Sequence, residues 1–224
     1  MVKLFFPVIQ GLDYLTCLLT LISLFSMKKV GLLIFVVFLV VLAQTQSEVI
    51  WQKVRARYQK VNTAQGSFHQ NVCSESLGTC QEFVGWFYLK RPDKLRLNVT
   101  FPDSQNIIVS GNKIWFHFPA QSEVSEQELP GKLSPFDIFS DSLTMTVAET
   151  RNEDNLVYLK LVTKDTFALI IGLDLWVNPK DFSIKKFAYP QGPGTVATFE
   201  LYSTKFNKKI SDKIFEVPAP KKEN

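Results

Sequence analysis

Few side chains in this sequence have the types and spacing that catalysis or metal binding requires. The 224 residues include two histidines, His69 and His117, which lie far apart in the chain, and three cysteines. These numbers exclude a metal site built from several histidines. Signatures of phosphate-binding loops, dinucleotide-binding turns and serine hydrolases are absent from the sequence as well. The sequence therefore predicts neither an enzyme nor a protein that holds a metal ion or an organic cofactor.

Cys73 and Cys80 are the pair whose spacing suggests covalent chemistry. The third cysteine, Cys17, lies in an apolar N-terminal segment, so an exported mature chain would keep an even number. An even count in an exported protein favours a disulfide, and two free thiols are the alternative. The bond would close a small loop at the tip of a hairpin. Because the sequence has no C-x-x-C motif, a structural bridge is favoured over a redox centre.

The N-terminal segment has the features of a targeting sequence. Lysines in the short stretch 27–29 precede an uncharged apolar run over residues 30–42. That run is shorter than the ~20 residues of a transmembrane helix, and small or medium residues lead to a cleavage position after Ala43. The pattern predicts a signal peptide over residues 27–43. Residues 1–26 are interpreted as a mis-called start, and a two-helix membrane anchor is the alternative.

Residues 44–224 are expected to form a single, mainly β domain. Hydrophobic residues make up 46% of the chain and charged residues 21%, which excludes a disordered or fibrous protein. The net charge of +4 is too small to indicate nucleic-acid binding. Apolar and polar residues alternate between turn signals, most clearly over residues 95–101 and 169–176. This alternation predicts roughly nine or ten short antiparallel strands in one curved sheet.

Two segments are expected to be helical and to cover the apolar face of this sheet. Residues 47–62 carry apolar side chains at helical spacing, with basic side chains on the other side. Residues 134–146 begin with Ser134 and Pro135, which suit an N-cap and the first helical position. If these helices fill the interior, the domain is simply stable. If they cover it loosely, an apolar pocket remains, and the sheet pattern alone leaves both alternatives open.

A longer pattern carries a resemblance to a known family. Over residues 85–119, a Gly-led strand ends in Lys-Arg-Pro, an alternating strand and a Pro-Asp turn follow, and a strand ending in Val-Ser-Gly leads into Ile-Trp-Phe-His-Phe. The motifs at residues 67–70 (Ser-Phe-His-Gln), 134–136 (Ser-Pro-Phe) and 214–218 (Ile-Phe-Glu-Val-Pro) match in the same order. On these motifs the chain resembles the LolA family of periplasmic lipoprotein carriers over nearly all of residues 47–220.

The resemblance implies an unclosed β-barrel, or half-barrel, with a helical lid, as in LolA and LolB. It implies no catalysis: a hydrophobic cavity shields the acyl chains of lipoproteins that cross the periplasm. The family takes this cargo from an inner-membrane lipoprotein-releasing ABC transporter and passes it to an outer-membrane receptor. The carrier is expected to be a periplasmic monomer without a cofactor. A related half-barrel that acts as a lipid-binding sensor, or as a membrane-anchored receptor, is the alternative.

Arg91 is the residue for which the sequence gives the most specific functional prediction. Alternation through residues 87–91 places it on the face that Phe87 and Leu89 share, which is assigned as inward. In the family, the matching arginine bonds backbone carbonyls of the lid and holds the empty carrier closed. An arginine at a strand end whose head reaches solvent is the alternative. The apolar residues expected to bind acyl chains with it are Phe87, Leu89, Leu95, Leu97, Val99, Phe101, Phe116 and Phe118, and ordinary core packing is the alternative for each.

Overall fold

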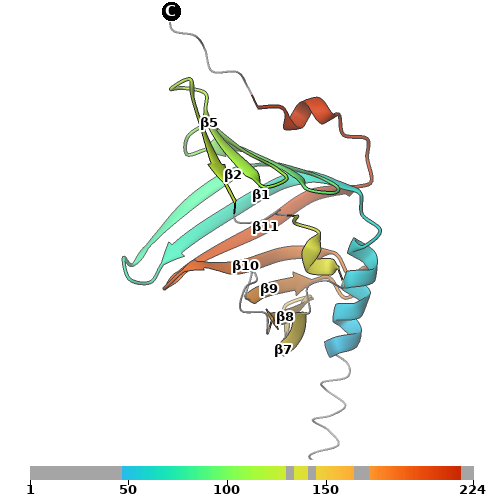
Figure 1. Ribbon diagram of the computed structural model, residues 1–224. Helices are drawn as coiled ribbons and strands as arrows, with labels where there is room; N and C mark the ends of the chain where they lie inside the picture. Colours follow the sequence, from blue (N-terminus) through green and yellow to red (C-terminus); the bar gives the residue numbers. More distant parts are fainter. Residues whose placement is uncertain (1–46, 130–133, 141–144, 164–171, 218–224) are drawn as a thin grey trace, which may run out of the picture. The chain divides into compact units, whose positions relative to one another are not determined.

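Eleven strands form one antiparallel sheet in the computed structural model, which describes residues 47–129, 134–140, 145–163 and 172–217 (Figure 1). The strands are β1 (Thr63–Ser74), β2 (Thr79–Lys90), β3 (Lys94–Phe101), β4 (Gln105–Ser110), β5 (Lys113–Phe118), β6 (Glu123–Glu128), β7 (Met145–Glu153), β8 (Leu156–Thr163), β9 (Gly172–Val177), β10 (Ile184–Gly192) and β11 (Thr195–Phe206). Their order across the sheet is β6-β5-β4-β3-β2-β1-β11-β10-β9-β8-β7. Two meanders, β1–β6 and β7–β11, are therefore joined where β1 pairs with β11. Within the described residues β6 and β7 remain unpaired edges, so the sheet is not closed.

The expected fold class, mainly β with an unclosed antiparallel sheet, is confirmed. The period of two that was read from the sequence is clear in β9, where Leu173, Leu175 and Val177 are buried and Asp174 and Trp176 face the opposite way. We call the face that carries the buried leucines the inner face, and the opposite one the outer face. The inner face is the one that must find a cover.

The N-terminal helix, residues 47–58, lies on the inner face (Figure 1). It buries Trp51, Val54 and Tyr58 in the same core as the sheet. The Tyr58 hydroxyl accepts a hydrogen bond from the backbone N–H of Ile184 at 2.9 Å, and burial raises the pKa of Tyr58 to about 12. The predicted helix over residues 47–62 is therefore confirmed in place, although it ends at residue 58.

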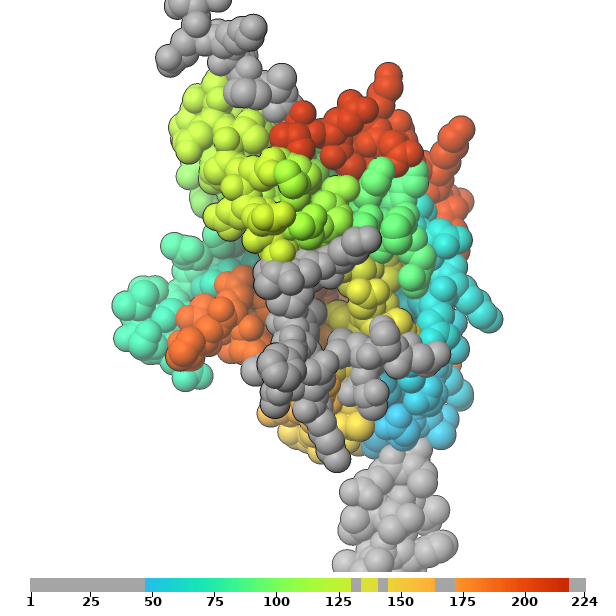
Figure 2. Space-filling view, viewed as in Figure 1, coloured from blue at the N-terminus to red at the C-terminus, as the bar shows by residue number. Residues whose placement is uncertain are grey.

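The second predicted helix, over residues 134–146, is wrong. Its first part forms a short 3₁₀ helix, η1 (Asp137–Phe139), and β7 begins at Met145, while residues 141–144 lie outside the described residues. The sequence that opens β7 is rich in β-branched residues, which favour a strand over a helix. Phe139 of η1 stacks on Tyr58 of the N-terminal helix with ring centroids 4.6 Å apart. These two short elements lie side by side in Figure 2 and together cover part of the inner face.

A second, smaller core lies on the outer face and was not predicted. The 3₁₀ helix η2 (Asp212–Phe215) contacts β3 and β4 there. It buries Phe215 and the nearby Ile210, and Ile108 of β4 is fully buried beneath this segment. The Arg96 guanidinium donates to the Ile214 carbonyl oxygen at 2.7 Å and so fastens the segment to β3. The carboxyl end of the described chain is therefore an integral part of the domain.

The predicted signal peptide at residues 27–43 and the segment before it lie outside the described residues. In the parts of the chain that the structure describes, no helix is long and apolar enough to cross a membrane.

Cys73 and Cys80 are bonded to each other at the end of the β1–β2 hairpin. They are direct partners in the register of the two strands, with Cα atoms 4.1 Å apart. The turn beyond them presents Leu77, which is 75% exposed. The bond therefore closes a short loop that would otherwise have little packing to hold it.

We predict that replacing both cysteines by serine lowers the free energy of unfolding by about 2 kcal/mol, because a short loop loses little chain entropy when it closes. Urea unfolding of the variant and of the wild type, with and without reductant, measures the difference. Reduction should destabilise the wild type and leave the double-serine variant unchanged. Complete alkylation of both thiols in the unreduced, denatured protein would show instead that the bond is not formed.

Candidate functional site

The sheet register brings most of the predicted apolar site residues together on the inner face. Phe87 lies opposite Leu97, and Leu89 lies opposite Leu95, across the β2–β3 pair. Phe87 and Val99 are buried in the main core, whereas Leu89, Leu95 and Leu97 are only partly buried. The predicted face is therefore assembled as expected from β2 and β3.

On β5 the predicted residues Phe116 and Phe118 are both partly buried. Phe116 pairs with Ile107 of β4, which in turn lies opposite Leu97 of β3. One apolar row thus runs from β2 to β5 on the inner face. Its members beyond β3 keep part of their surface exposed, unlike the residues beneath the N-terminal helix.

Phe101 is the exception, because it lies on the outer face. Gly85 of β2 pairs with Val99 of β3, but the next residue, Val84, pairs with Phe101. One extra residue in β3, Thr100, makes a β-bulge that turns Phe101 away from the interior, and it is 51% exposed. The assignment of Phe101 to the inner face was therefore wrong.

A glycine marks the position of this bulge. A Cβ atom on Gly85 would lie 2.2 Å from the backbone oxygen of Asn98 in β3, so only glycine permits the two backbones to approach this closely. A glycine inside a strand is a known sign of a bulge or of close backbone approach. The sequence thus contained the signal that could have corrected the orientation of Phe101.

Arg91 links the cover to the sheet. Its Nε donates to the Val61 carbonyl oxygen at 2.7 Å, and its Nη2 donates to the Tyr58 carbonyl oxygen at 3.3 Å. Its guanidinium carbon lies 4.4 Å from the centroid of the Phe136 ring, just before η1. The carbonyl groups at the carboxyl end of a helix lack partners within the helix and carry partial negative charge, so a cation suits this position. These contacts differ from the alternative of a head group that points into solvent.

Other polar contacts join the two parts of the cover to each other. Arg55 of the N-terminal helix donates to the Ser140 carbonyl oxygen at 2.9 Å, and Gln59 donates to the Phe139 carbonyl oxygen at 3.0 Å. The Ser134 hydroxyl donates to the Pro92 carbonyl oxygen at 2.7 Å, immediately after Arg91. The cover is therefore attached through its buried side chains, hydrogen bonds and stacked rings, since its backbone does not join the strands of the sheet.

Sequence reasoning missed an aromatic group on the other half of the inner face. Phe187 of β10 stacks on Phe199 of β11 with centroids 4.8 Å apart, and Tyr189 stacks beside them. Phe187 and Tyr189 are only partly buried, as is Phe83 of β2. The alternation of Phe187 and Tyr189 around Ala188 was the signal that could have identified them.

The comparisons with known proteins agree with this arrangement. The family model described as outer membrane lipoprotein carrier protein LolA matches residues 59–218. The chain belongs to the LolA family. The match includes all eleven strands, Arg91 and η1, and begins directly after the N-terminal helix.

Several relatives are named outer-membrane lipoprotein carrier proteins. One from Pseudomonas aeruginosa is 27% identical over 188 residues, which cover 80% of this chain and 88% of the relative. One from Methylococcus capsulatus is 30% identical over 132 residues, covering 54% of this chain and 64% of the relative. A third, from Photorhabdus laumondii, is 34% identical, but the match spans only 36% of its length.

Solved structures of LolA-type proteins are similar as well. A LolA superfamily protein from Nitrosomonas europaea has a TM-score of 0.44 and 17% identity, covering 76% of this chain and 97% of that one. A lipoprotein-sorting protein domain from Vibrio parahaemolyticus has a TM-score of 0.43 and 11% identity, covering 74% and 94%. At these scores neither similarity bears on function.

The two orientations of phenylalanine in β2 and β3 can be separated by stability measurements. Phe87→Ala should lower the free energy of unfolding by about 3–5 kcal/mol, because the side chain is buried in the main core. Phe101→Ala should change it by no more than about 0.5 kcal/mol, as is usual for an exposed site. Chemical denaturation of both variants makes the comparison. Equal losses would mean that Phe101 faces the interior after all.

Proposed function

We propose that this LolA-family chain is a periplasmic carrier that binds the acyl chains of lipoproteins on its inner face and escorts them between membranes. The observation that carries this proposal is an apolar face that is only partly covered: its side chains are buried beneath a small cover held by Arg91 and stay partly exposed beside it. The family membership and the names of the relatives support the same role. The partly exposed side chains offered to cargo include Leu89, Leu97, Phe116, Phe187 and Tyr189.

Acyl chains need such an escort because of the free energy of their transfer into water. Each methylene group removed from water contributes about 0.8 kcal/mol, so a lipoprotein with two or three acyl chains leaves a membrane very slowly unaided. An apolar sheet face with flexible and aromatic side chains removes the same surface from water without specific geometry. A carrier of this kind requires no catalytic group and no cofactor.

Arg91 is the residue that we expect to control access. In the closed form it holds the carboxyl end of the N-terminal helix and stacks on Phe136 of the η1 segment. Cargo that enters between the cover and the sheet would have to separate these groups. The loss of the Arg91 contacts is then one part of the free-energy cost of opening, beside the exposure of the buried side chains of the cover, and the return of these contacts favours expulsion of the acyl chains.

The partners follow from the same proposal. An inner-membrane lipoprotein-releasing ABC transporter would supply the acylated protein, and an outer-membrane receptor would accept it. The signal peptide predicted over residues 27–43 would deliver the chain, as a monomer, to the periplasm. Mass spectrometry of material that co-purifies from native periplasm tests the proposal directly: acylated polypeptide is expected, and its consistent absence from freshly isolated protein would contradict a carrier.

We predict that Arg91→Leu traps cargo on the carrier. The closed form loses two charge-assisted hydrogen bonds worth about 1.5–3 kcal/mol each, whereas the open, loaded form loses little. The variant should load lipoprotein at least as readily as the wild type and release it poorly. Arg91→Lys should be intermediate, because an ammonium group keeps the charge but lacks the planar fork.

A transfer assay that follows the carrier–lipoprotein complex measures both steps. Arg151→Leu is a matched control, since Arg151 is an exposed arginine on β7 that contacts Glu149 and Glu153 instead of the cover. If Arg91→Leu loads and releases cargo at wild-type rates, Arg91 does not control access.

A further inference from the structure

Four exposed apolar side chains lie close together on the outer face, away from the inner face proposed for cargo. They are Val84 (37% exposed), Trp86 (50%), Phe101 (51%) and Tyr202 (48%), and we call them the outer aromatic patch. Large aromatic side chains are rarely left half in water without a reason, and exposed clusters of them mark interaction sites. The β-bulge in β3 adds to the patch, because it turns Phe101 outward to lie opposite Val84.

The strand register determines the spacing within the patch. Ser67 of β1 pairs with Trp86 of β2 on one side and with Tyr202 of β11 on the other. Two strand spacings therefore separate the backbones that carry the two aromatic rings, roughly 10 Å, and only the small serine side chain stands between them. That spacing leaves room for one inserted side chain flanked by an aromatic ring on each side.

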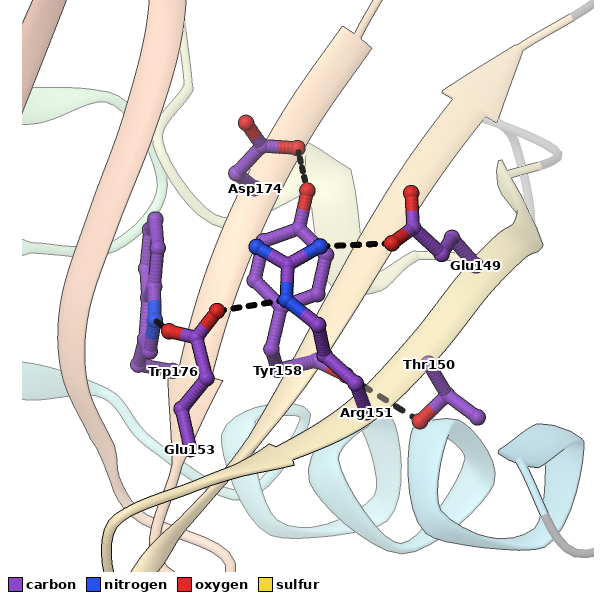
Figure 3. A network of polar contacts seen from close by, with 7 residues as sticks. All are labelled: Glu149, Thr150, Arg151, Glu153, Tyr158, Asp174 and Trp176. Carbon is purple, nitrogen blue, oxygen red and sulfur yellow. Dashed lines mark hydrogen bonds and ion pairs between the residues drawn. The ribbon is translucent and has the colours of Figure 1, made fainter.

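On the other half of the outer face, aromatic rings are covered by cationic side chains of the same chain. The Arg151 guanidinium carbon lies 3.6 Å from the centroid of the Tyr158 ring (Figure 3). The guanidinium nitrogens donate hydrogen bonds to the carboxylates of Glu149 and Glu153. In the same way, Nζ of Lys186 lies 4.6 Å from the centroid of the Trp176 ring. Each of these two outward-facing rings on β8 and β9 is thus covered by a cation from the chain itself. Among the described residues, no cation lies over the rings of Trp86, Phe101 or Tyr202.

Carboxylates lie near the uncovered rings of the patch, as they do near the covered rings of Tyr158 and Trp176. Glu200 of β11 accepts a hydrogen bond from the Tyr202 hydroxyl at 2.5 Å. Glu82 of β2, two residues before Val84, pairs with His69 at 2.7 Å and has a side chain that is 53% exposed. The patch therefore has rings and carboxylates like those of the Arg151 network. The nearest basic groups in the described chain are His69, which pairs with Glu82, and Lys186, which lies opposite Glu200 in the strand register and over the Trp176 ring, so the rings of the patch themselves carry no cation.

We propose that the outer aromatic patch docks a partner protein through a segment in which an arginine or lysine lies between apolar residues. The cation would enter between Trp86 and Tyr202 and approach Glu200, and the flanking apolar side chains would cover Val84 and Phe101. This arrangement repeats, between two proteins, the contacts that Arg151 makes within this one. A patch of this size supports a weak and transient contact, which suits a protein that must meet and leave its partners.

The test uses the mature, folded chain and two labelled peptides, acetyl-Leu-Arg-Leu-Arg-Leu-amide and its neutral counterpart acetyl-Leu-Gln-Leu-Gln-Leu-amide. Fluorescence anisotropy should show that the arginine peptide binds about fivefold more tightly or better, since a cation is attracted to an exposed aromatic ring and a nearby carboxylate adds to this attraction. In NMR spectra the indole N–H of Trp86 should shift on binding, whereas that of Trp51, which is 1% exposed, should not.

Variants locate the site. Trp86→Ser and Tyr202→Ser should each weaken binding of the arginine peptide about fivefold or more, and Glu200→Gln should reduce its dependence on salt. Leu77→Ser is the control, because it removes an exposed apolar side chain that is 75% exposed but lies at the hairpin tip. Because about half of each ring is exposed, the variants should still fold and unfold cooperatively, and uptake of acyl cargo on the inner face should be unchanged.

Four results would each overturn the proposal. The first is equal binding of the arginine and glutamine peptides, and the second is wild-type binding by both serine variants. The third is a monomer–dimer equilibrium that Trp86→Ser abolishes, which would assign the patch to a second copy of the chain. The fourth is Trp86-dependent binding to phosphatidylglycerol vesicles with no binding of the arginine peptide, which would assign it to a membrane.

Discussion

The structure depends on one constraint: a wide apolar sheet face must be covered, and the chain supplies little to cover it. In the described residues the cover consists of the N-terminal helix and the single turn η1. Beneath the helix the burial is complete, as Val54 and Leu159 show. Toward β5 and β10 it is partial, and Phe116 and Phe187 keep some exposure. A sheet closed into a barrel would remove this imbalance, but the edges β6 and β7 stay apart.

At the sheet edge and on the outer face, charged side chains prevent further strand pairing or cover aromatic rings. Glu123, Glu126 and Glu128 place charge along the edge strand β6, which discourages pairing with another sheet. On β7, Arg151 covers Tyr158 and so buries an aromatic ring without a second layer of structure. Among the segments that the structure describes, η2 is the one that adds a packed apolar core on this side. The outer aromatic patch differs from both: within the described chain, no cation lies over its rings and no segment such as η2 packs on it.

Much of this fold could be predicted from the sequence, because alternation with a period of two follows directly from strand geometry. The register that places Phe87, Leu89, Leu95 and Leu97 on one face is such a case. Predictions failed where a local feature interrupted this alternation. A single extra residue in β3 turned the Phe101 side chain to the outer face. The η1 turn was expected to be a long helix because Ser134 and Pro135 specify how a helix begins and say nothing about how long it continues. The contacts of Arg91 depend on a helix thirty residues earlier and needed the tertiary structure.

The attachment of the cover through Arg91 has a consequence for the direction of transport under the proposed function. Breaking the two Arg91 hydrogen bonds costs on the order of 3–6 kcal/mol, less the hydrogen bonds that the freed groups regain with water. About four to eight methylene groups of an acyl chain would offset that cost at ~0.8 kcal/mol each. An ordinary lipoprotein acyl chain exceeds this length, so the return of the two Arg91 hydrogen bonds cannot by itself expel the cargo. Arg91 would therefore tune how tightly the chain is held, and the free energy for release must come from an acceptor that removes the acyl chains from water at least as well as the inner face does.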